Sequence, residues 1–170
     1  MRLWCLVAGL ALVAWPLSAR AEHARIDLKL THLDEGGGAK GEEVTAHADR
    51  EPPAGGLNER PLATVKTGEP LALQFFLTNT YPHGVKKDVT VRYYVVREEK
   101  RGQKRVPDLT AGTVTEGRFK LNFKPGCRVG ARVTFRVPEP GVYLLRVETL
   151  NTDSDHEHFS AIDVQAAKAP

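Results

Sequence analysis

Two histidines and three carboxylates lie within six positions near the end of the chain. The surrounding stretch is D-S-D-H-E-H-F-S-A-I-D-V, and its histidines, His156 and His158, are separated by a single residue. In an extended strand, side chains two positions apart point to the same side. Imidazoles suit Cu(II), Zn(II) or Ni(II), and carboxylates can complete the ligand shell. The spacing suggests a copper or zinc site that also uses Asp155.

Two other interpretations of the same stretch stay open. Asn, Thr, Asp and Ser in N-T-D-S-D are ordinary turn formers, so the stretch is also typical of a polar hairpin loop. Neighbouring carboxylates favour a charged imidazolium, so clustered histidines can instead form a pH-sensitive surface. A histidine pair alone lacks the longer spacing patterns that make zinc motifs specific.

Catalytic motifs are absent from the sequence. It contains no G-x-S-x-G and no H-E-x-x-H, and G-G-G-A-K-G at residues 36–41 lacks the Walker pattern. Cys127 lies in K-P-G-C-R-V-G, a predicted turn, and a thiol nucleophile paired with a distant histidine stays an alternative. We therefore expect a domain that is not an enzyme and that has no cofactor other than a copper or zinc ion.

The N-terminus has the pattern of a secretory signal peptide. Arg2 precedes an uncharged run over residues 3–15, which is too short to span a bilayer, and small residues flank Arg20 at the expected cleavage site. We expect residues 1–21 to be removed, which leaves no transmembrane anchor and a mature chain that begins at Glu22. The protein would then be secreted or periplasmic.

Charge and cysteine content narrow the classes of partner. The chain has 24 Lys and Arg against 21 Asp and Glu, and loss of Arg2 and Arg20 leaves 22 against 21, or +1. This balance does not favour nucleic acid or an anionic membrane. Cleavage also removes Cys5, so Cys127 is then a single cysteine that cannot form an internal disulfide.

Alternating apolar and polar residues predict an all-β fold. The alternation recurs in turn-separated segments rich in Val, Phe, Tyr and Thr, and no segment has helical periodicity. The predicted strands are residues 25–31, 62–66, 71–80, 88–98, 117–123, 131–137, 142–150 and 158–165. Seven to eight strands of this kind predict a single antiparallel β-sandwich.

A long segment between the first two predicted strands has the composition of a loop. It contains G-G-G, P-P and G-G, and only residues 44–48 fit a short edge strand. We divide the chain into the signal peptide, residues 22–61 with one strand and a long flexible loop, and residues 62–170 with the rest of the sandwich and a short tail.

Two segments resemble immunoglobulin-like and fibronectin-type-III-like domains. P-G-V-Y-L-L-R-V at residues 140–147 resembles their penultimate strand, and T-G-E-P-L-A-L-Q-F at residues 67–75 resembles the entry to their second strand. The resemblance concerns the fold and identifies no narrower family. It implies that Tyr143 hydrogen-bonds back across the corner of the sandwich, and that the B–C and F–G loops lie at one end.

This topology would bring distant histidines together. His83 falls in the B–C loop, His156 and His158 fall at the F–G loop, and His23 precedes the first strand. The function that we expect is an exported binding or accessory domain that contacts a cell-envelope or extracellular protein through its loops. The alternative is a periplasmic copper- or zinc-binding protein that uses the histidine cluster.

Overall fold

The computed structural model describes residues 24–48, 60–80, 84–103, 107–150 and 158–169. In this part of the chain every regular element is a strand, so it has no helix long and apolar enough to cross a membrane. The predicted signal peptide, residues 1–21, lies outside the described residues. Its cleavage and the export of the chain therefore stay predictions.

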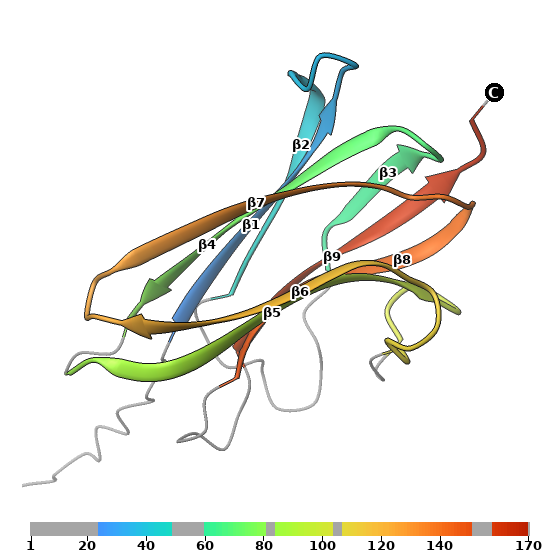
Figure 1. Cartoon of the computed structure of the whole chain (residues 1–170). Helices are drawn as coiled ribbons and strands as arrows, with labels where there is room; N and C mark the ends of the chain where they lie inside the picture. The colour runs from blue at the N-terminus through green and yellow to red at the C-terminus, as the bar shows by residue number, and fades with distance from the viewer. Residues whose placement is uncertain (1–23, 49–59, 81–83, 104–106, 151–157, 170) are drawn as a thin grey trace, which may run out of the picture.

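Nine strands are arranged in two layers (Figure 1). They are β1 (Ala24–Leu33), β2 (Ala39–Ala48), β3 (Leu62–Lys66), β4 (Pro70–Asn79), β5 (Lys86–Glu98), β6 (Thr113–Phe123), β7 (Arg128–Arg136), β8 (Gly141–Leu150) and β9 (His158–Ala167). One sheet has the order β2-β1-β4-β7 and the other β3-β9-β8-β5-β6. All pairs are antiparallel except β3 with β9. The predicted all-β antiparallel sandwich is confirmed.

The strand order is immunoglobulin-like, as the sequence resemblance implied. Strands β1, β4 and β7 take the places of A, B and E in one sheet, and β5, β8 and β9 take those of C, F and G in the other. β3 adds to the free side of β9, and β2 adds to the free side of β1.

Alternation places one face of each sheet in the core. On β4, Leu71, Leu73, Phe75 and Leu77 are fully buried, as their period of two predicts. The Phe75 ring lies 5.7 Å from the ring of Tyr93 and 6.5 Å from that of Phe119, between ring centroids. These contacts join β4 of the first sheet to β5 and β6 of the second.

Strand β8 departs from simple alternation, because both of its faces are covered. Every residue from Tyr143 to Thr149 is buried. On the outer face of the five-stranded sheet a second apolar cluster forms, which consists of Tyr94, Val96, Leu144 and Ala161. When both faces of a sheet are covered, neither face of its central strand contacts solvent. Buried and exposed residues then do not alternate along that strand.

The predicted tyrosine corner is confirmed. The Tyr143 hydroxyl donates a hydrogen bond to the main-chain carbonyl of Glu139, at 2.9 Å. Burial raises the pKa of the Tyr143 phenol above its ordinary value, while the nearby Arg97 guanidinium acts in the opposite direction. The hydrogen bond closes the connection from β7 into β8.

Strand β2 differs from the sequence-based expectation of a long loop. It begins at Ala39, whereas only residues 44–48 fitted a strand, and it pairs with β1 from Leu33 to Ile26. The ladder shifts its register between Thr31 and His32, next to Gly41, which has a φ of 76°. A bulge interrupts the period-two pattern, so the sequence pattern hides this strand.

Candidate functional site

The structure brings together the chain segments that flank the predicted histidine cluster. The start of β1 pairs with the end of β4, since Ala24 lies opposite Asn79. The start of β9 pairs with the end of β8, since His158 lies opposite Thr149, and Leu150 lies opposite Thr90 of β5. The B–C and F–G connections therefore leave from the same end of the sandwich, as the immunoglobulin-like topology implied.

The histidine cluster itself falls outside the described residues. This holds for His23, His83, Asp155 and His156, and also for the side chain of His158, the first residue of β9. Elsewhere in the described ranges no group of three or more His, Cys, Asp or Glu side chains is placed to hold a metal ion. The copper or zinc site stays a prediction that these residues do not test.

A different feature emerges on strands β6 and β7. β6 is the last strand of one sheet and β7 the last strand of the other, and a short turn joins them along one side of the sandwich (Figure 1). Between residues 113 and 137 there are six basic residues and one acidic residue, Glu116, so six minus one gives a local charge of +5. All six are exposed, and we call this set the basic edge: Arg118, Lys120, Lys124, Arg128, Arg132 and Arg136.

The turn between β6 and β7 fixes the register of the basic edge. Gly126 has a φ of 68°, a conformation that favours glycine, and its N–H donates to the Asn79 carbonyl at 3.1 Å. The Asn79 N–H donates to the Cys127 carbonyl at 3.0 Å, and the Asn79 side chain donates to the Phe123 carbonyl at 3.1 Å. This is the pattern of a bulge with glycine at its first position. Cys127 is a half-buried free thiol in this turn.

Two of the six cations have visible partners. The Arg128 guanidinium lies 4.0 Å from the centre of the Phe76 ring and 3.8 Å from a carboxylate oxygen of Asp27. Arg136 donates a hydrogen bond to the carbonyl of Gly68. For the other four, Arg118, Lys120, Lys124 and Arg132, no ion pair is formed with any residue that the structure describes. Their charge is thus available to an outside partner.

Apolar side chains that are only half-buried lie behind the basic edge. They point inward between the two sheets and pack against the core without being fully covered, and they are Phe119, Leu121, Val129, Ala131 and Val133. Facing residues on the central strands, such as Leu73 and Val95, are fully buried. The sandwich is therefore less completely closed along β6 and β7 than at its centre.

The outer face of the five-stranded sheet carries a buried ion-pair network. The Arg60 guanidinium lies 3.2 Å from both oxygens of Glu98 and 2.7 Å from Asp163, and Arg101 reaches the other oxygen of Asp163 at 3.0 Å. The Glu98 and Asp163 side chains are almost fully buried. Burial raises the pKa of Glu98 above its ordinary value, Arg60 lowers it, and Asp163 raises it further.

A second pair of arginines neutralises Glu148 on the same face. The Glu148 side chain is 1% exposed; Arg146 lies 2.7 Å from one of its oxygens and Arg92 contacts the other. The Arg146 guanidinium also lies 3.9 Å from the centre of the Phe159 ring. Since each of these buried carboxylates contacts an arginine, the network ties strands and flanking segments together. Buried pairs of this kind are costly to break by removing one partner.

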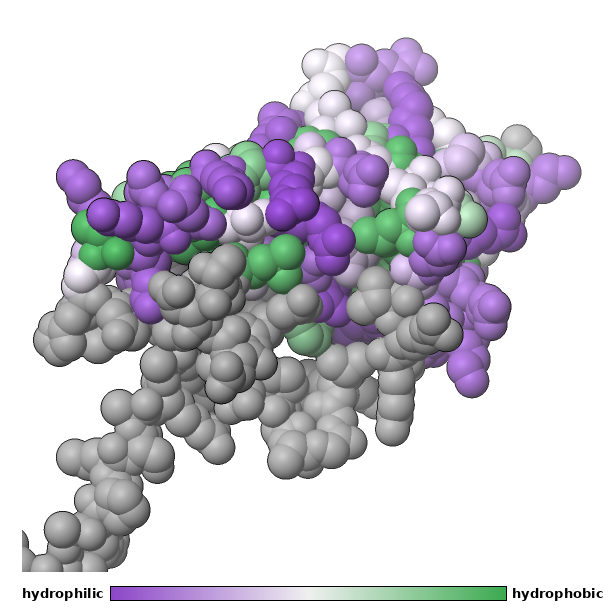
Figure 2. All heavy atoms as spheres, turned by 60° about the horizontal axis from the view of Figure 1, so that its bottom comes forward, coloured by the Kyte–Doolittle hydropathy of each residue, from purple (hydrophilic) through white to green (hydrophobic). Residues whose placement is uncertain are grey.

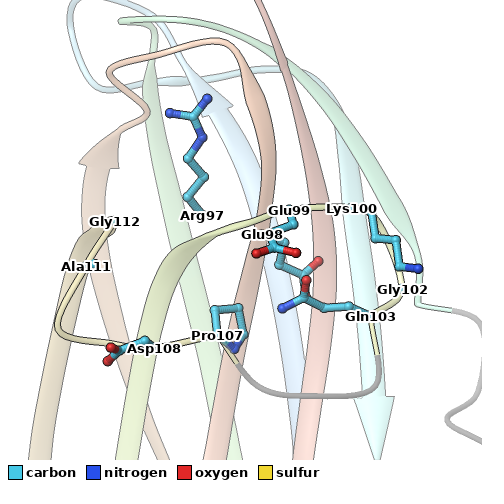
Figure 3. A pocket seen from close by; sticks show the side chains of 10 residues that line it. All are labelled: Arg97, Glu98, Glu99, Lys100, Gly102, Gln103, Pro107, Asp108, Ala111 and Gly112. Carbon is cyan, nitrogen blue, oxygen red and sulfur yellow. The ribbon is translucent and has the colours of Figure 1, made fainter.

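A pocket lies beside this network, at the connection from β5 to β6 (Figure 3). Its lining includes Glu98, Gln103, Pro107 and Asp108. In Figure 3 the Arg97 side chain extends away from Gln103 and Pro107, and it donates to Glu139 at 2.7 Å. The lining mixes both signs of charge with turn residues, so it favours no single class of ligand.

Sequence reasoning missed both the basic edge and the buried network. A charge count over residues 113–137 would have found the +5 segment. The network could not be found this way, because Arg60 and Glu98 are 38 residues apart and Arg101 and Asp163 are 62 apart.

No protein-family model matches the chain, and no curated protein sequence matches it. Among solved structures, a family 123 glycoside hydrolase from Clostridium perfringens is 10% identical, with a TM-score of 0.43 over 65% of this chain and 23% of that one. The catalytic domain of the LPMO Lmo2467 from Listeria monocytogenes is 15% identical, with a TM-score of 0.34 over 62% of this chain and 59% of that one. A human ASH/PapD-like domain of CEP192 is 16% identical, with a TM-score of 0.33 over 65% of this chain and 84% of that one.

These likenesses concern the β-sandwich fold, and with such low identities and TM-scores none of them assigns an activity, a substrate or a partner. They do correct one expectation. The sequence led us to expect a domain that is not an enzyme, and this is contradicted, since the similar structures include a glycoside hydrolase and an LPMO catalytic domain. A missing motif is a weak ground for excluding catalysis, because the same chemistry recurs on unrelated folds without a shared sequence pattern.

Proposed function

We propose that this chain is an exported binding domain that recognises an acidic partner through the basic edge. The observation that carries the proposal is the unpaired charge on Arg118, Lys120, Lys124 and Arg132 within the described part of the chain. Clustered cations without acidic neighbours attract an acidic partner and accelerate its approach. The signal-peptide pattern supports a partner in the cell envelope or outside the cell.

The rest of the described surface supports recognition by charge. Figure 2 shows hydrophilic side chains over much of the visible surface, with smaller hydrophobic areas between them. Among the described residues only Leu62 and Val85 are large hydrophobic side chains with high exposure. An interface built on a broad apolar patch would need more exposed apolar area than these two residues supply.

The proposal is tested by calorimetric titration of the protein with poly-L-glutamate at about 0.05 M and about 0.5 M salt. We expect binding that weakens strongly with salt, because exposed charges are screened within about 10 Å at 0.1 M. The variant Arg118→Glu/Lys120→Glu/Arg132→Glu should bind at least about tenfold more weakly at low salt.

A matched variant distinguishes the contribution of the basic edge to binding from the effect of the net charge. Lys40, Lys66 and Lys168 are also exposed and form no ion pair with any described residue, and they lie outside β6 and β7. Changing these three to Glu alters the net charge by the same amount. If both triple variants lose binding equally, the net charge and not the basic edge is responsible, and the proposal fails.

A metal-binding function is the second candidate, and the convergence of strand ends favours it. The B–C and F–G connections, which hold His83 and His156, leave from one end of the sandwich. We propose calorimetric titration with Cu(II) and Zn(II), with His156→Ala/His158→Ala as the comparison. One-to-one binding that this variant loses would support the site, and equally weak binding by both proteins would reject it.

A further inference from the structure

Strand β7 presents a long, regular edge that no described strand occupies. Its register with β4 runs without a shift from Arg128 to Arg136. The other outermost strands are less suited to pairing: β3 has five residues, and β2 and β6 have register shifts. An uninterrupted edge of nine residues is a template for an added strand.

The hydrogen-bond pattern shows which residues face that edge. Asn79 bonds the carbonyl of Cys127, and bonded and non-bonded positions alternate along an antiparallel pair. The odd-numbered residues of β7 therefore bond β4, and the even-numbered residues turn their N–H and C=O groups to the free side. These are Arg128, Gly130, Arg132, Thr134 and Arg136, the same residues whose side chains are exposed.

The positive charge of the β7 edge determines which kind of added strand can pair with it. If two copies paired antiparallel about Arg132, Arg132 would lie opposite itself and Arg128 opposite Arg136. Like charges placed directly opposite are destabilising, so the edge disfavours a second copy. Acidic residues at the same positions would instead form favourable cross-strand pairs with all three arginines.

We propose that an extended acidic segment of a partner protein adds to β7 as an antiparallel strand. The inference rests on the proposed function and specifies how the acidic partner binds. Acidic side chains of the segment lie opposite Arg128, Arg132 and Arg136, while its intervening apolar side chains face inward. There they cover the half-buried Val129 and Val133 and complete the sandwich on its less closed side.

The probe follows from this register. It is the nine-residue peptide Glu-Val-Thr-Val-Glu-Val-Thr-Val-Glu with blocked ends, whose three glutamates lie opposite Arg136, Arg132 and Arg128 in turn. A second peptide carries N-methyl groups on its third, fifth and seventh residues, which removes three donors to β7 and keeps every charge. Binding of both peptides, of poly-L-glutamate and of a single-stranded oligothymidylate is measured by calorimetry.

Strand addition predicts that N-methylation weakens binding at least about tenfold, because it removes three main-chain hydrogen bonds to β7. The amides of Gly130, Arg132 and Thr134 should also exchange with solvent more slowly when the unmodified peptide is bound. The variant Thr134→Pro removes one free-edge N–H and no charge, so it should lose the peptide and retain poly-L-glutamate.

The outcomes separate the two proposals. If both peptides and the oligonucleotide bind equally well, the basic edge binds anions without strand addition, and this inference is overturned while the proposed function stands. If neither peptide nor poly-L-glutamate binds, the proposed function fails as well. The N-methylated peptide keeps the test decisive if Thr134→Pro does not fold.

Discussion

Removing the hydroxyl group of Tyr143 tests whether the hydrogen bond at the immunoglobulin-like corner stabilises the fold. The substitution Tyr143→Phe removes its hydrogen bond to Glu139 and leaves the carbonyl acceptor beside a buried ring. We expect the free energy of unfolding to fall by about 0.5–1.5 kcal/mol in urea denaturation. Tyr93→Phe is the control, since that ring is half-buried and its hydroxyl forms no hydrogen bond with any residue in the described ranges. Equal losses in the two variants would mean that the corner bond does not stabilise the fold.

Glu98 makes stability depend on pH in a direction opposite to most paired carboxylates. Its folded-state pKa is raised above the ordinary value of 4.5, so the folded protein holds the proton more tightly. Its contribution to stability is therefore fully present below the unfolded pKa and is lost as the pH rises through the folded pKa.

The measurement is the free energy of unfolding between about pH 4 and about pH 8. The wild type should lose stability relative to Glu98→Gln as the pH rises, because the amide cannot ionise. Glu116→Gln, which changes an exposed carboxyl on β6, is the matched control. A gap between wild type and Glu98→Gln that stays constant with pH would contradict the assignment.

For single residues, the sequence predicts the positions of apolar side chains better than the partners of charged ones. Inward positions such as Leu73 and Val91 follow from alternation, because each depends only on its neighbours along the strand. The partners of Asp163 and Glu148 do not, because a long arginine side chain can reach a carboxylate on another strand from many sequence positions. The predicted ligands His83, Asp155 and His156 remain untested.

Strands β5 and β6 pack closely because Gly117 leaves room for an aromatic ring. A Cβ atom added at Gly117 would lie 2.3 Å from atoms of the Tyr93 ring, well inside van der Waals contact. The two residues are register partners, and the Tyr93 ring also packs on Phe75. Glycine in this strand therefore serves close packing.

The substitution Gly117→Ala should destabilise the protein by about 1–3 kcal/mol, since the ring must move from its place against Phe75. Thermal and urea unfolding measure this cost. In a Tyr93→Ala background the same substitution should cost much less, because the clashing ring is absent. Equal costs in both backgrounds would show that the Tyr93 contact is not the cause.

Elements were predictable where their alternation is uninterrupted. The strands that became β1, β4, β5, β8 and β9 were placed within a few residues of their observed bounds. β2 was mostly missed, because glycines and a register shift remove its period-two signal and its charged side chains resemble those of a loop. β6 was predicted four residues too short, since Thr113 to Glu116 precede its clear alternation.

Over the whole molecule, charge is distributed unevenly although its total is small. The chain has a formal net charge of +3, while residues 113–137 alone carry +5. This charge lies on β6 and β7, which are neighbours in sequence but edge strands of different sheets. Neither the total charge nor the strand pattern alone predicts this arrangement.

The positive charges of the β7 edge oppose its pairing with a second copy of the chain. Removing one of these charges should therefore increase self-association. We expect Arg132→Val to increase self-association, since it extends the apolar character of β7 and removes the central repulsion. Size-exclusion chromatography with light scattering at about 0.1 M salt measures the change. Lys40→Val on the distant strand β2 is the control, and self-association of that variant to the same extent would argue against a special role for β7.

The most direct measurement of the central claim is a charge-swap binding assay. Poly-L-glutamate and poly-L-lysine are titrated into the wild type, the Arg118→Glu/Lys120→Glu/Arg132→Glu variant and the Lys40→Glu/Lys66→Glu/Lys168→Glu variant, all at about 0.05 M salt. If the basic edge is the binding surface, the wild type and the second variant prefer poly-L-glutamate, and the first variant prefers poly-L-lysine. The same preference in both triple variants would contradict the account.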